Sequence, residues 1–397
     1  MRNQLLHTPE GVRDIYNGEC EKKLMLQEKL HATLKHYGYH SIQTPSFEFF
    51  DIFGKEVGTI PSRDLYKFFD REGNTLVLRP DITPSIARSV AKYFQDEDMP
   101  IRLCYMGNIF INNNSYQGRL KESTQLGAEL IGDNSVDADA EMISMAIESL
   151  KSCGLREFQI SVGHVDFFRG LMEAAGLSED QEENIRELIA NKNFFGVEEA
   201  VDSCEMPEDL KKLFGMLGVL YDGPGEFAEA KQIADAYPRL REAVCHLEAL
   251  DEVLKIYDVD KYITYELGML SSYKYYTGVI FAGYTYGSGE PIVKGGRYDR
   301  LLPHFGKDAP SIGFAFVVDQ LMAAIARQHI EIPVPHDNQM IVYKAPLRRE
   351  AINKARALRH QGCNVELVLW QEGRTQAHYE DYASARNIAT LLWMDGE

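Results

Sequence analysis

The sequence predicts an α+β protein in which an antiparallel sheet flanked by helices carries a helical insertion and is followed by a small α/β domain. Three stretches support this fold. Residues 102–131 have a hairpin pattern, residues from about 170 to 257 are almost wholly helical, and residues 339–397 alternate strands and helices. We therefore expect a core over residues 1–327, a proline-marked linker over 328–338 and a terminal domain over 339–397.

The composition argues against several classes of protein. The 397 residues include 42 basic and 60 acidic side chains, and a formal net charge of -18 repels a polyanion such as a nucleic acid. The six cysteines are scattered without a C-x-x-C pair, so neither a zinc site nor a disulfide framework is expected. Because there is no leader pattern and no apolar run of about 18 residues, we expect a cytoplasmic protein without a membrane partner.

The N-terminal segment is expected to hold a long helix and a strand. Apolar spacing predicts a helix that ends near His36, with Gly38 as its C-terminal cap. Residues 40–44 then have the composition of a strand, which Pro45 stops. A helix of this kind packs on its own core or lies in an interface, and its periodicity does not distinguish the two.

Two short strands lead to a second helix. Residues 65–70 and 75–78 have strand composition and flank a glycine-containing turn. The helix that follows is expected to run through Phe94, because Thr83 is a natural N-cap and Pro84 a natural first helical residue.

The hairpin over residues 102–131 offers the first candidate site. Side chains alternate along a strand, so Gln125, Gly127 and Glu129 share one face, while Leu126 and its neighbours on the other face are expected to pack on helices. An amide and a carboxylate separated by glycine could hold a small polar ligand. The alternative is an ordinary solvent-facing strand edge.

The remaining elements follow from apolar spacing and from breaks at proline and glycine. Ser178 is a candidate helix cap, and the acidic residues of the helical stretch are expected to form a solvated face, not a metal site. The other helices and strands are expected at residues 137–150, 158–162, 279–281, 340–343, 348–360, 365–370, 377–387 and 389–393, and residues 311–321 are expected to be a strand that enters a helix.

Several motifs resemble the histidyl branch of the class II aminoacyl-tRNA synthetases. The hairpin, with Gly107-x-x-Phe110, Gly118-Arg119 and Thr124-Gln125-Leu126-Gly127-x-Glu129, resembles the second class II motif. The N-terminal helix, strand and Pro45 resemble the first motif, and residues 311–321 the third. The loop at Asp81 and the stretches at Tyr276 and Tyr298 resemble the family sequences R-P-E-G-T, R-G-L-D-Y-Y and G-G-R-Y-D. The resemblance covers about residues 5 to 327.

This resemblance implies a pocket for histidine. Asp81 and Thr83 would hold the amino group of the ligand, although Asp81 is one methylene shorter than the glutamate of the family. A phenol opposite Glu129 would clamp the two ring nitrogens of an imidazole. The tyrosines could equally be plain sheet packing. The complete set of expected histidine-binding residues is Asp81, Thr83, Gln125, Glu129, Tyr275, Tyr276 and Tyr298.

The residues that the family uses to activate histidine with ATP are replaced. Ile111, Ser271 and Gln320 stand where the family has arginines that neutralise the reacting carboxylate and phosphate. Asn113 and Lys274 replace two acidic residues of the same machinery. Arg119, at the hairpin tip, remains as a possible anion contact. We therefore expect little adenylation, no catalytic residue, no cofactor and no metal.

Retention of the amino-acid pocket with loss of the ATP site resembles the regulatory subunits of ATP phosphoribosyltransferase. That resemblance implies a non-catalytic protein that works with a short-form catalytic subunit in the first step of histidine biosynthesis and mediates feedback by histidine. It also implies a self-dimer through the N-terminal helix, no tRNA, and a C-terminal domain like a shortened anticodon-binding domain. The alternatives are a functional histidyl-tRNA synthetase and a histidine-sensing paralogue with another client.

Overall fold

The computed structural model describes residues 6–54, 60–113, 120–270, 275–334 and 338–395. The chain divides into two compact units, each described by itself. The larger unit holds residues 1–14 and 26–331, and the smaller one holds residues 332–397 together with 15–25.

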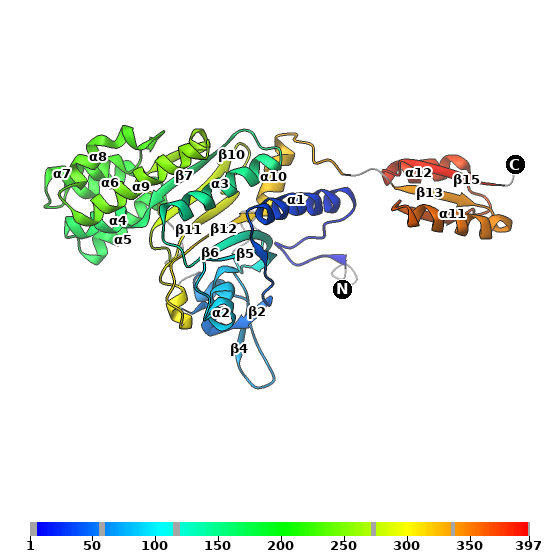
Figure 1. Ribbon diagram of the computed structural model, residues 1–397, viewed down its shortest axis with the longest axis horizontal. Helices are drawn as coiled ribbons and strands as arrows, with labels where there is room; N and C mark the ends of the chain where they lie inside the picture. The colour runs from blue at the N-terminus through cyan, green and yellow to red at the C-terminus, as the bar shows by residue number, and fades with distance from the viewer. Residues whose placement is uncertain (1–5, 55–59, 114–119, 271–274, 335–337, 396–397) are drawn as a thin grey trace. The chain divides into compact units, whose positions relative to one another are not determined.

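A nine-stranded mixed sheet forms the centre of the larger unit (Figure 1). Six of its eight pairings are antiparallel, in line with the predicted antiparallel sheet. The other two, β1 with β5 and β7 with β9, are parallel. In spatial order its strands are β1 (His40–Ser41), β5 (Ile101–Phe110), β6 (Glu122–Ile131), β12 (Ser311–Val317), β11 (Val293–Arg297), β10 (Val279–Thr285), β7 (Phe158–His164), β9 (Ile263–Glu266) and β8 (Leu220–Tyr221). Parallel neighbours need long crossover connections, and both pairs have intervening helices in the chain.

The predicted hairpin is confirmed as β5 and β6, whose register pairs Leu103 with Glu129 and Gly107 with Gln125. The alternation also holds, since the face of β6 opposite to Gln125 and Glu129 packs beneath helices α3 (Val136–Ser152) and α10 (Val318–Arg327). The other face of β6 is therefore left to the candidate site.

Helix α1 (Asn17–His36) ends where the sequence predicts. Gly38 then adopts a φ of 83°, a left-handed conformation that favours glycine after a helix. The predicted strand at residues 40–44 is shorter than expected, because β1 stops at Ser41. The guanidinium of Arg79 donates to the carbonyls of Thr44 and Pro45, so these groups bond a side chain and not a neighbouring strand.

The strands predicted at residues 65–70 and 75–78 lie in a second, three-stranded sheet. They form β3 (Lys67–Phe69) and β4 (Thr75–Leu78), and a strand that was not predicted, β2 (Phe47–Phe49), pairs with the other side of β4. Helix α2 (Thr83–Tyr93) follows this sheet and brings the Asp81–Thr83 loop beside β6.

Helices gather beyond β7, as the green part of Figure 1 shows. The prediction of an almost wholly helical stretch is confirmed, with only the two-residue β8 between the helices. Ser178 caps α5 in a capping box with Gln181, as expected. The helices are α4 (Val165–Ala175), α5 (Glu179–Ala190), α6 (Phe194–Asp202), α7 (Glu208–Met216), α8 (Ala228–Ala234) and α9 (Pro238–Ile256). Short 3-10 turns occur at Phe50–Phe53, Ser62–Asp64, Pro224–Phe227, Asp260–Tyr262, Leu302–Phe305 and Ala345–Leu347.

The smaller unit confirms the predicted alternation of strands and helices. Its three strands are parallel in the order β14, β13, β15. Two apolar clusters cover the two faces of this sheet, one around Met340 and Tyr379 and the other around Ile341 and Ala351. The elements are β13 (Gln339–Tyr343), α11 (Arg348–His360), β14 (Val365–Leu369), α12 (Gln376–Ala385) and β15 (Thr390–Met394).

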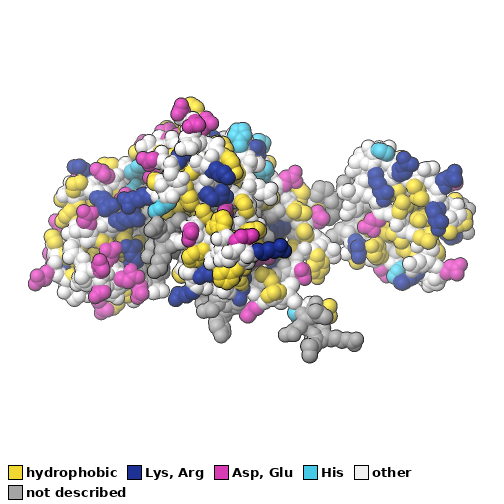
Figure 2. All heavy atoms as spheres, turned by 90° about the horizontal axis from the view of Figure 1, so that it is seen from below, with side chains coloured by type: hydrophobic (Ala, Val, Ile, Leu, Met, Phe, Trp, Pro, Cys, Tyr) yellow, Lys and Arg dark blue, Asp and Glu magenta, His cyan; other side chains and the backbone are white. Residues whose placement is uncertain are grey.

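Acidic and basic side chains lie interspersed with hydrophobic ones on the face drawn in Figure 2. Within the described ranges, no helix is both long and apolar enough to cross a membrane.

Candidate functional site

The floor of the candidate site is the face of β6 that carries Gln125 and Glu129, together with its neighbour β12. Glu129 on β6 lies in register with Gly313 on β12, and Gly313 with Gly296 on β11. A side chain at Gly313 would collide with the carboxylate of Glu129, and one at Gly296 would press on the ring of Tyr276. Glycine at these two positions therefore lets the functional side chains lie flat on the sheet.

Glu129 is the most deeply buried acid of the site, with 1% of its surface exposed. Thr83 Oγ1 donates to Glu129 Oε1 at 2.7 Å, and the Tyr298 hydroxyl donates to Oε2 at 2.7 Å. Burial raises the pKa of the Glu129 carboxyl to about 8, against the opposing effect of the hydrogen bonds from Tyr298 and Thr83. The carboxyl is therefore mostly protonated at neutral pH while the pocket is empty.

The prediction that Thr83 is a helix N-cap is wrong. Helix α2 begins at Thr83 itself, and Ile82 occupies the cap position without a capping side-chain hydrogen bond. The physical reason is that the Thr83 hydroxyl is engaged by Glu129 across the pocket. Pro84, predicted as the first helical residue, is the second residue of α2 and still lies in its first turn.

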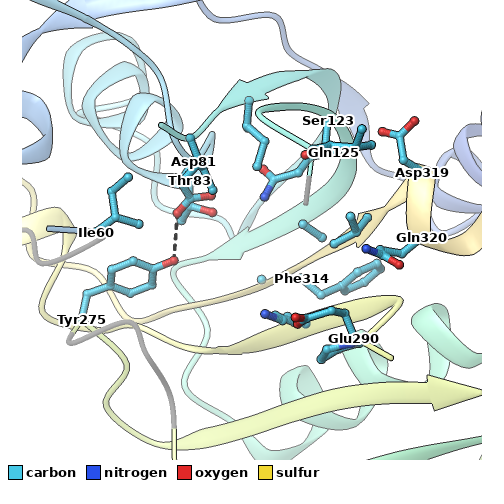
Figure 3. A pocket seen from close by; sticks show the side chains of 18 of the residues that line it. Ile60, Asp81, Thr83, Ser123, Gln125, Tyr275, Glu290, Phe314, Asp319 and Gln320 are labelled. Atoms are coloured by element: carbon cyan, nitrogen blue, oxygen red, sulfur yellow. Dashed lines mark hydrogen bonds between the residues drawn. The ribbon is translucent and has the colours of Figure 1, made fainter. Parts of the chain in front are cut away.

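Asp81 forms a second buried acidic position, 3% exposed. Its Oδ1 accepts from the backbone N–H of Ile82 at 2.8 Å, and its Oδ2 accepts from the Tyr275 hydroxyl at 3.0 Å, the contact marked in Figure 3. Burial raises the pKa of Asp81, although these hydrogen bonds favour its ionised form. A cation in the pocket would stabilise both buried carboxylates.

Gln125 contributes a polar group that has no partner among the described residues. The residue is 6% exposed, and no described group donates a hydrogen bond to its side-chain oxygen. A buried carbonyl oxygen without a partner is costly, and a ligand N–H that bonded to it would remove that cost. Figure 3 shows the Gln125 side chain over the pocket, between the end that holds Asp81 and the end that holds Asp319.

Three buried tyrosines form one wall. The rings of Tyr275 and Tyr276 are 5.0 Å apart, and those of Tyr275 and Tyr298 are 6.0 Å apart. The cluster is thus both a packing unit, as the alternative interpretation expected, and a source of phenols. The Tyr298 phenol contacts Glu129 directly, so an imidazole held between these two groups would have to replace their hydrogen bond.

All seven predicted histidine-binding residues line a single cavity of about 460 Å³. Ile111, Asn113 and Gln320, which replace ATP-site residues, line it too. Arg119, Ser271 and Lys274 lie outside the described residues. The lining residues that were not predicted come partly from the same hairpin and partly from distant segments. They are Ile60, Asp64, Ile109, Leu120, Ser123, Glu290, Pro291, Lys294, Gly313, Phe314, Ala315, Val317 and Asp319.

The described lining is acidic. Lys294 is its one basic residue, and five residues are acidic: Asp64, Asp81, Glu129, Glu290 and Asp319. Asp319 accepts from the backbone N–H of Thr124 at 2.7 Å, which fixes α10 to β6 beside the pocket. Such a lining attracts positive charge and repels phosphate.

Arg297, in the stretch that resembles G-G-R-Y-D, does not enter the pocket. It is the last residue of β11, and its guanidinium bonds Asp139 of α3, which is fully buried. His246 of α9 lies 2.7 Å from the other oxygen of Asp139. This cluster joins β11, α3 and α9. Within the described ranges, no group of three or more His, Cys, Asp or Glu side chains could hold a metal ion.

Known proteins resemble this chain over nearly its whole length. The family model described as histidyl-tRNA synthetase matches residues 11–321. An ATP phosphoribosyltransferase regulatory subunit from Acetivibrio thermocellus is 40% identical, with 98% of this chain and 91% of that protein covered. One from Ruminiclostridium cellulolyticum is 38% identical, with 98% and 92% covered.

A solved structure gives the same picture. The crystal structure of an ATP phosphoribosyltransferase regulatory subunit/histidyl-tRNA synthetase from Bacillus halodurans superposes with a TM-score of 0.86 at 32% identity. The match covers 99% of this chain and 99% of that one. The predicted class II synthetase-like fold is confirmed.

Proposed function

Because this chain belongs to the family of ATP phosphoribosyltransferase regulatory subunits, we propose that it is the non-catalytic regulatory partner of a short-form catalytic ATP phosphoribosyltransferase subunit. In this role it supports the first step of histidine biosynthesis and conveys feedback by histidine. It acts in the cytoplasm, as a dimer formed through the α1 region, and without tRNA.

One observation carries the proposal: the cavity keeps a floor suited to an amino acid but has an acidic lining. Adenylation brings a carboxylate against the α-phosphate of ATP, and fixed cations must neutralise both. Ile111 and Gln320 occupy lining positions where the resembling enzymes have arginines. The geometry therefore supports ligand binding without activation.

Histidine fits the polar groups of the cavity. Its ammonium group is suited to Asp81, which a positive charge would hold in the ionised form. Its imidazole N–H is suited to Glu129, where it would replace the donor Tyr298. The side-chain oxygen of Gln125, to which no described residue donates, can accept a further ligand N–H. A ligand that lacks these donors leaves buried groups unpaired, which gives selectivity for histidine over other amino acids.

Regulation requires that histidine bind two states of the complex with different affinity. Linkage then demands reciprocity: if histidine weakens substrate binding by some factor, substrate weakens histidine binding by the same factor. Binding studies of the complex with each ligand, alone and together, measure both factors.

The test is to assay a short-form catalytic subunit alone, with this protein, and with the double variant Gln125→Ala/Glu129→Ala. We expect the catalytic subunit to be poorly active by itself and fully active with this protein. With the double variant, histidine should no longer inhibit the catalytic subunit. Glu183→Ala, an exposed change on α5, is the control and should leave inhibition intact. Full activity of the catalytic subunit by itself would refute the partnership.

A separate assay tests the absence of activity in this chain. Purified protein with histidine and ATP should show no pyrophosphate exchange above background and should not charge tRNA. Losing one preorganised charge stabiliser typically costs about 10²–10³ in rate, so the loss of several leaves little adenylation. Robust exchange would identify the chain as a synthetase.

A further inference from the structure

The described residues of the cavity offer many groups to a cation and few to an anion. In the view of Figure 3, Asp81 and Thr83 lie at one end, and Asp319, Gln320 and Glu290 at the other. Glu129 lies on the floor beside Thr83. If every described side chain of the lining were ionised, five carboxylates would face one ammonium group, that of Lys294. Even with Asp81 and Glu129 protonated, the described part of the lining has three other acidic residues, Asp64, Glu290 and Asp319, and one basic residue.

We propose that the pocket recognises imidazole-bearing amines through the ring and the ammonium group alone, and that it binds them more tightly when their carboxylate is replaced by an uncharged group. This inference rests on the proposed function, since it concerns the ligand of the same site. Histidine binds, but its carboxylate opposes binding.

The argument follows from the buried acids. A ligand ammonium group beside Asp81, or a ring N–H at Glu129, stabilises the ionised form of that residue. A ligand carboxylate has the reverse effect, because like charges repel more strongly beside buried groups such as Asp81 and Glu129 than they do in water. The carboxylate also loses hydration, and a buried charge is stable only when it is paired.

The middle and far part of the cavity is suited to an uncharged polar group. The side chains of Ser123 and Gln320 supply neutral hydrogen-bonding groups in the lining, and Ile111 and Phe314 supply apolar surface. A primary amide or a hydroxymethyl group can form hydrogen bonds with the neutral polar side chains and pack on the apolar ones. Both groups are uncharged, so they need no counter-charge.

The test is calorimetry of the whole protein with histidine, histidine amide and histidinol as separate ligands. We expect all three to bind. Histidine amide and histidinol, which lack the carboxylate, should bind on the order of tenfold more tightly than histidine. Tighter binding of histidine than of both analogues overturns the inference and leaves the proposed function standing. Absence of binding by all three overturns both.

A gain-of-charge variant sharpens the test. Gln320→Arg places a cation in the lining and should reverse the preference, favouring histidine over histidine amide on the order of tenfold. Gln95→Arg is the matched control, because Gln95 is exposed and outside the lining, and it should leave the preference unchanged. An unchanged preference in Gln320→Arg contradicts the electrostatic account.

Arg119, predicted as a possible anion contact, is tested in the same way. Arg119→Gln should change the affinities for histidine and histidine amide by the same small factor. If it weakens histidine binding alone, Arg119 supplies a counter-charge for the carboxylate and the inference fails.

Discussion

At the scale of single residues, Glu129 decides the chemistry of the pocket. It is buried, it is bonded by Thr83 and Tyr298, and its pKa of about 8 lies far above the ordinary value of a glutamate. A site whose central acid is protonated when empty and ionised when it holds a cation couples binding to proton release.

Histidine binding should therefore release a proton. At pH 7 the empty pocket holds a proton on Glu129 that the bound imidazole N–H displaces, so roughly one proton leaves per ligand bound. Affinity should rise as the pH increases from 6 to 8 and level off above the pKa of Glu129. Calorimetry in buffers of different ionisation enthalpy measures the proton count. Heats that do not depend on the buffer would show that Glu129 stays protonated in the complex.

The raised pKa of Glu129 also predicts how the stability of the protein depends on pH. The folded protein keeps a proton on Glu129 between its ordinary pKa of 4.5 and about 8, whereas the unfolded chain releases it. The contribution of Glu129 to the free energy of unfolding is thus fully present below pH 4.5 and is lost as the pH rises through 8. The loss is on the order of 3–5 kcal/mol.

Glu129→Gln should remove this slope, because the amide is neutral at every pH and has a similar shape. Urea denaturation at pH 5.5 and pH 8.5 compares the two proteins. We expect the variant to gain stability relative to the parent as the pH rises, and to lose histidine binding. Equal slopes for the two proteins would contradict the assignment of the raised pKa to Glu129.

At the scale of secondary-structure elements, strand alternation explains both the success and the failure of the sequence-based predictions. Period-two alternation places Gln125 and Glu129 correctly on the pocket face of β6. The same rule separates Arg297 from Tyr298, since Tyr298 lines the pocket while Arg297 bonds Asp139 of α3. No local pattern marked Asp139 as the partner of Arg297, because the two residues meet only through the packing of α3 on the sheet.

The other lining residues illustrate the same limit. Glu290, Lys294 and Phe314 enter the cavity from segments far from β6 in sequence, and only the order of strands brings them together. The role of Thr83 was misjudged for a similar reason. Its local preference is to cap a helix, but a buried acid 46 residues away takes its hydroxyl.

The cluster of Asp139, Arg297 and His246 should hold β11, α3 and α9 together. Asp139→Ala leaves the guanidinium of Arg297, which is 5% exposed, without its buried partner and should cost about 3–5 kcal/mol of unfolding free energy. Glu148→Ala on the same helix breaks only an exposed pair with Lys151 and should cost less than about 1 kcal/mol. Urea denaturation followed by circular dichroism measures both. Equal costs would mean that the cluster contributes no more than a surface ion pair.

At the scale of the whole molecule, the two tryptophans give a selective view of one unit. The chain has 2 tryptophans, Trp370 and Trp393, and their rings lie 5.8 Å apart in the core of the smaller unit, beside Tyr379. Every described residue of the pocket belongs to the larger unit. Tryptophan fluorescence thus reports on the smaller unit, whereas the proposed histidine pocket belongs to the larger one.

Histidine should therefore separate the unfolding of the two units. A ligand that binds only the native state stabilises the unit that binds it by RT ln(1 + [L]/Kd), which is about 2.7 kcal/mol at a hundredfold excess over Kd. Because each unit has its own apolar core, we expect saturating histidine to raise the melting temperature seen by far-ultraviolet circular dichroism. The transition seen by tryptophan fluorescence should not move. In the double variant Gln125→Ala/Glu129→Ala, histidine should no longer raise the melting temperature seen by circular dichroism. The fluorescence transition should be the same as in the parent protein. If the melting temperature seen by fluorescence instead rises with histidine concentration as much as that seen by circular dichroism, the two units unfold together.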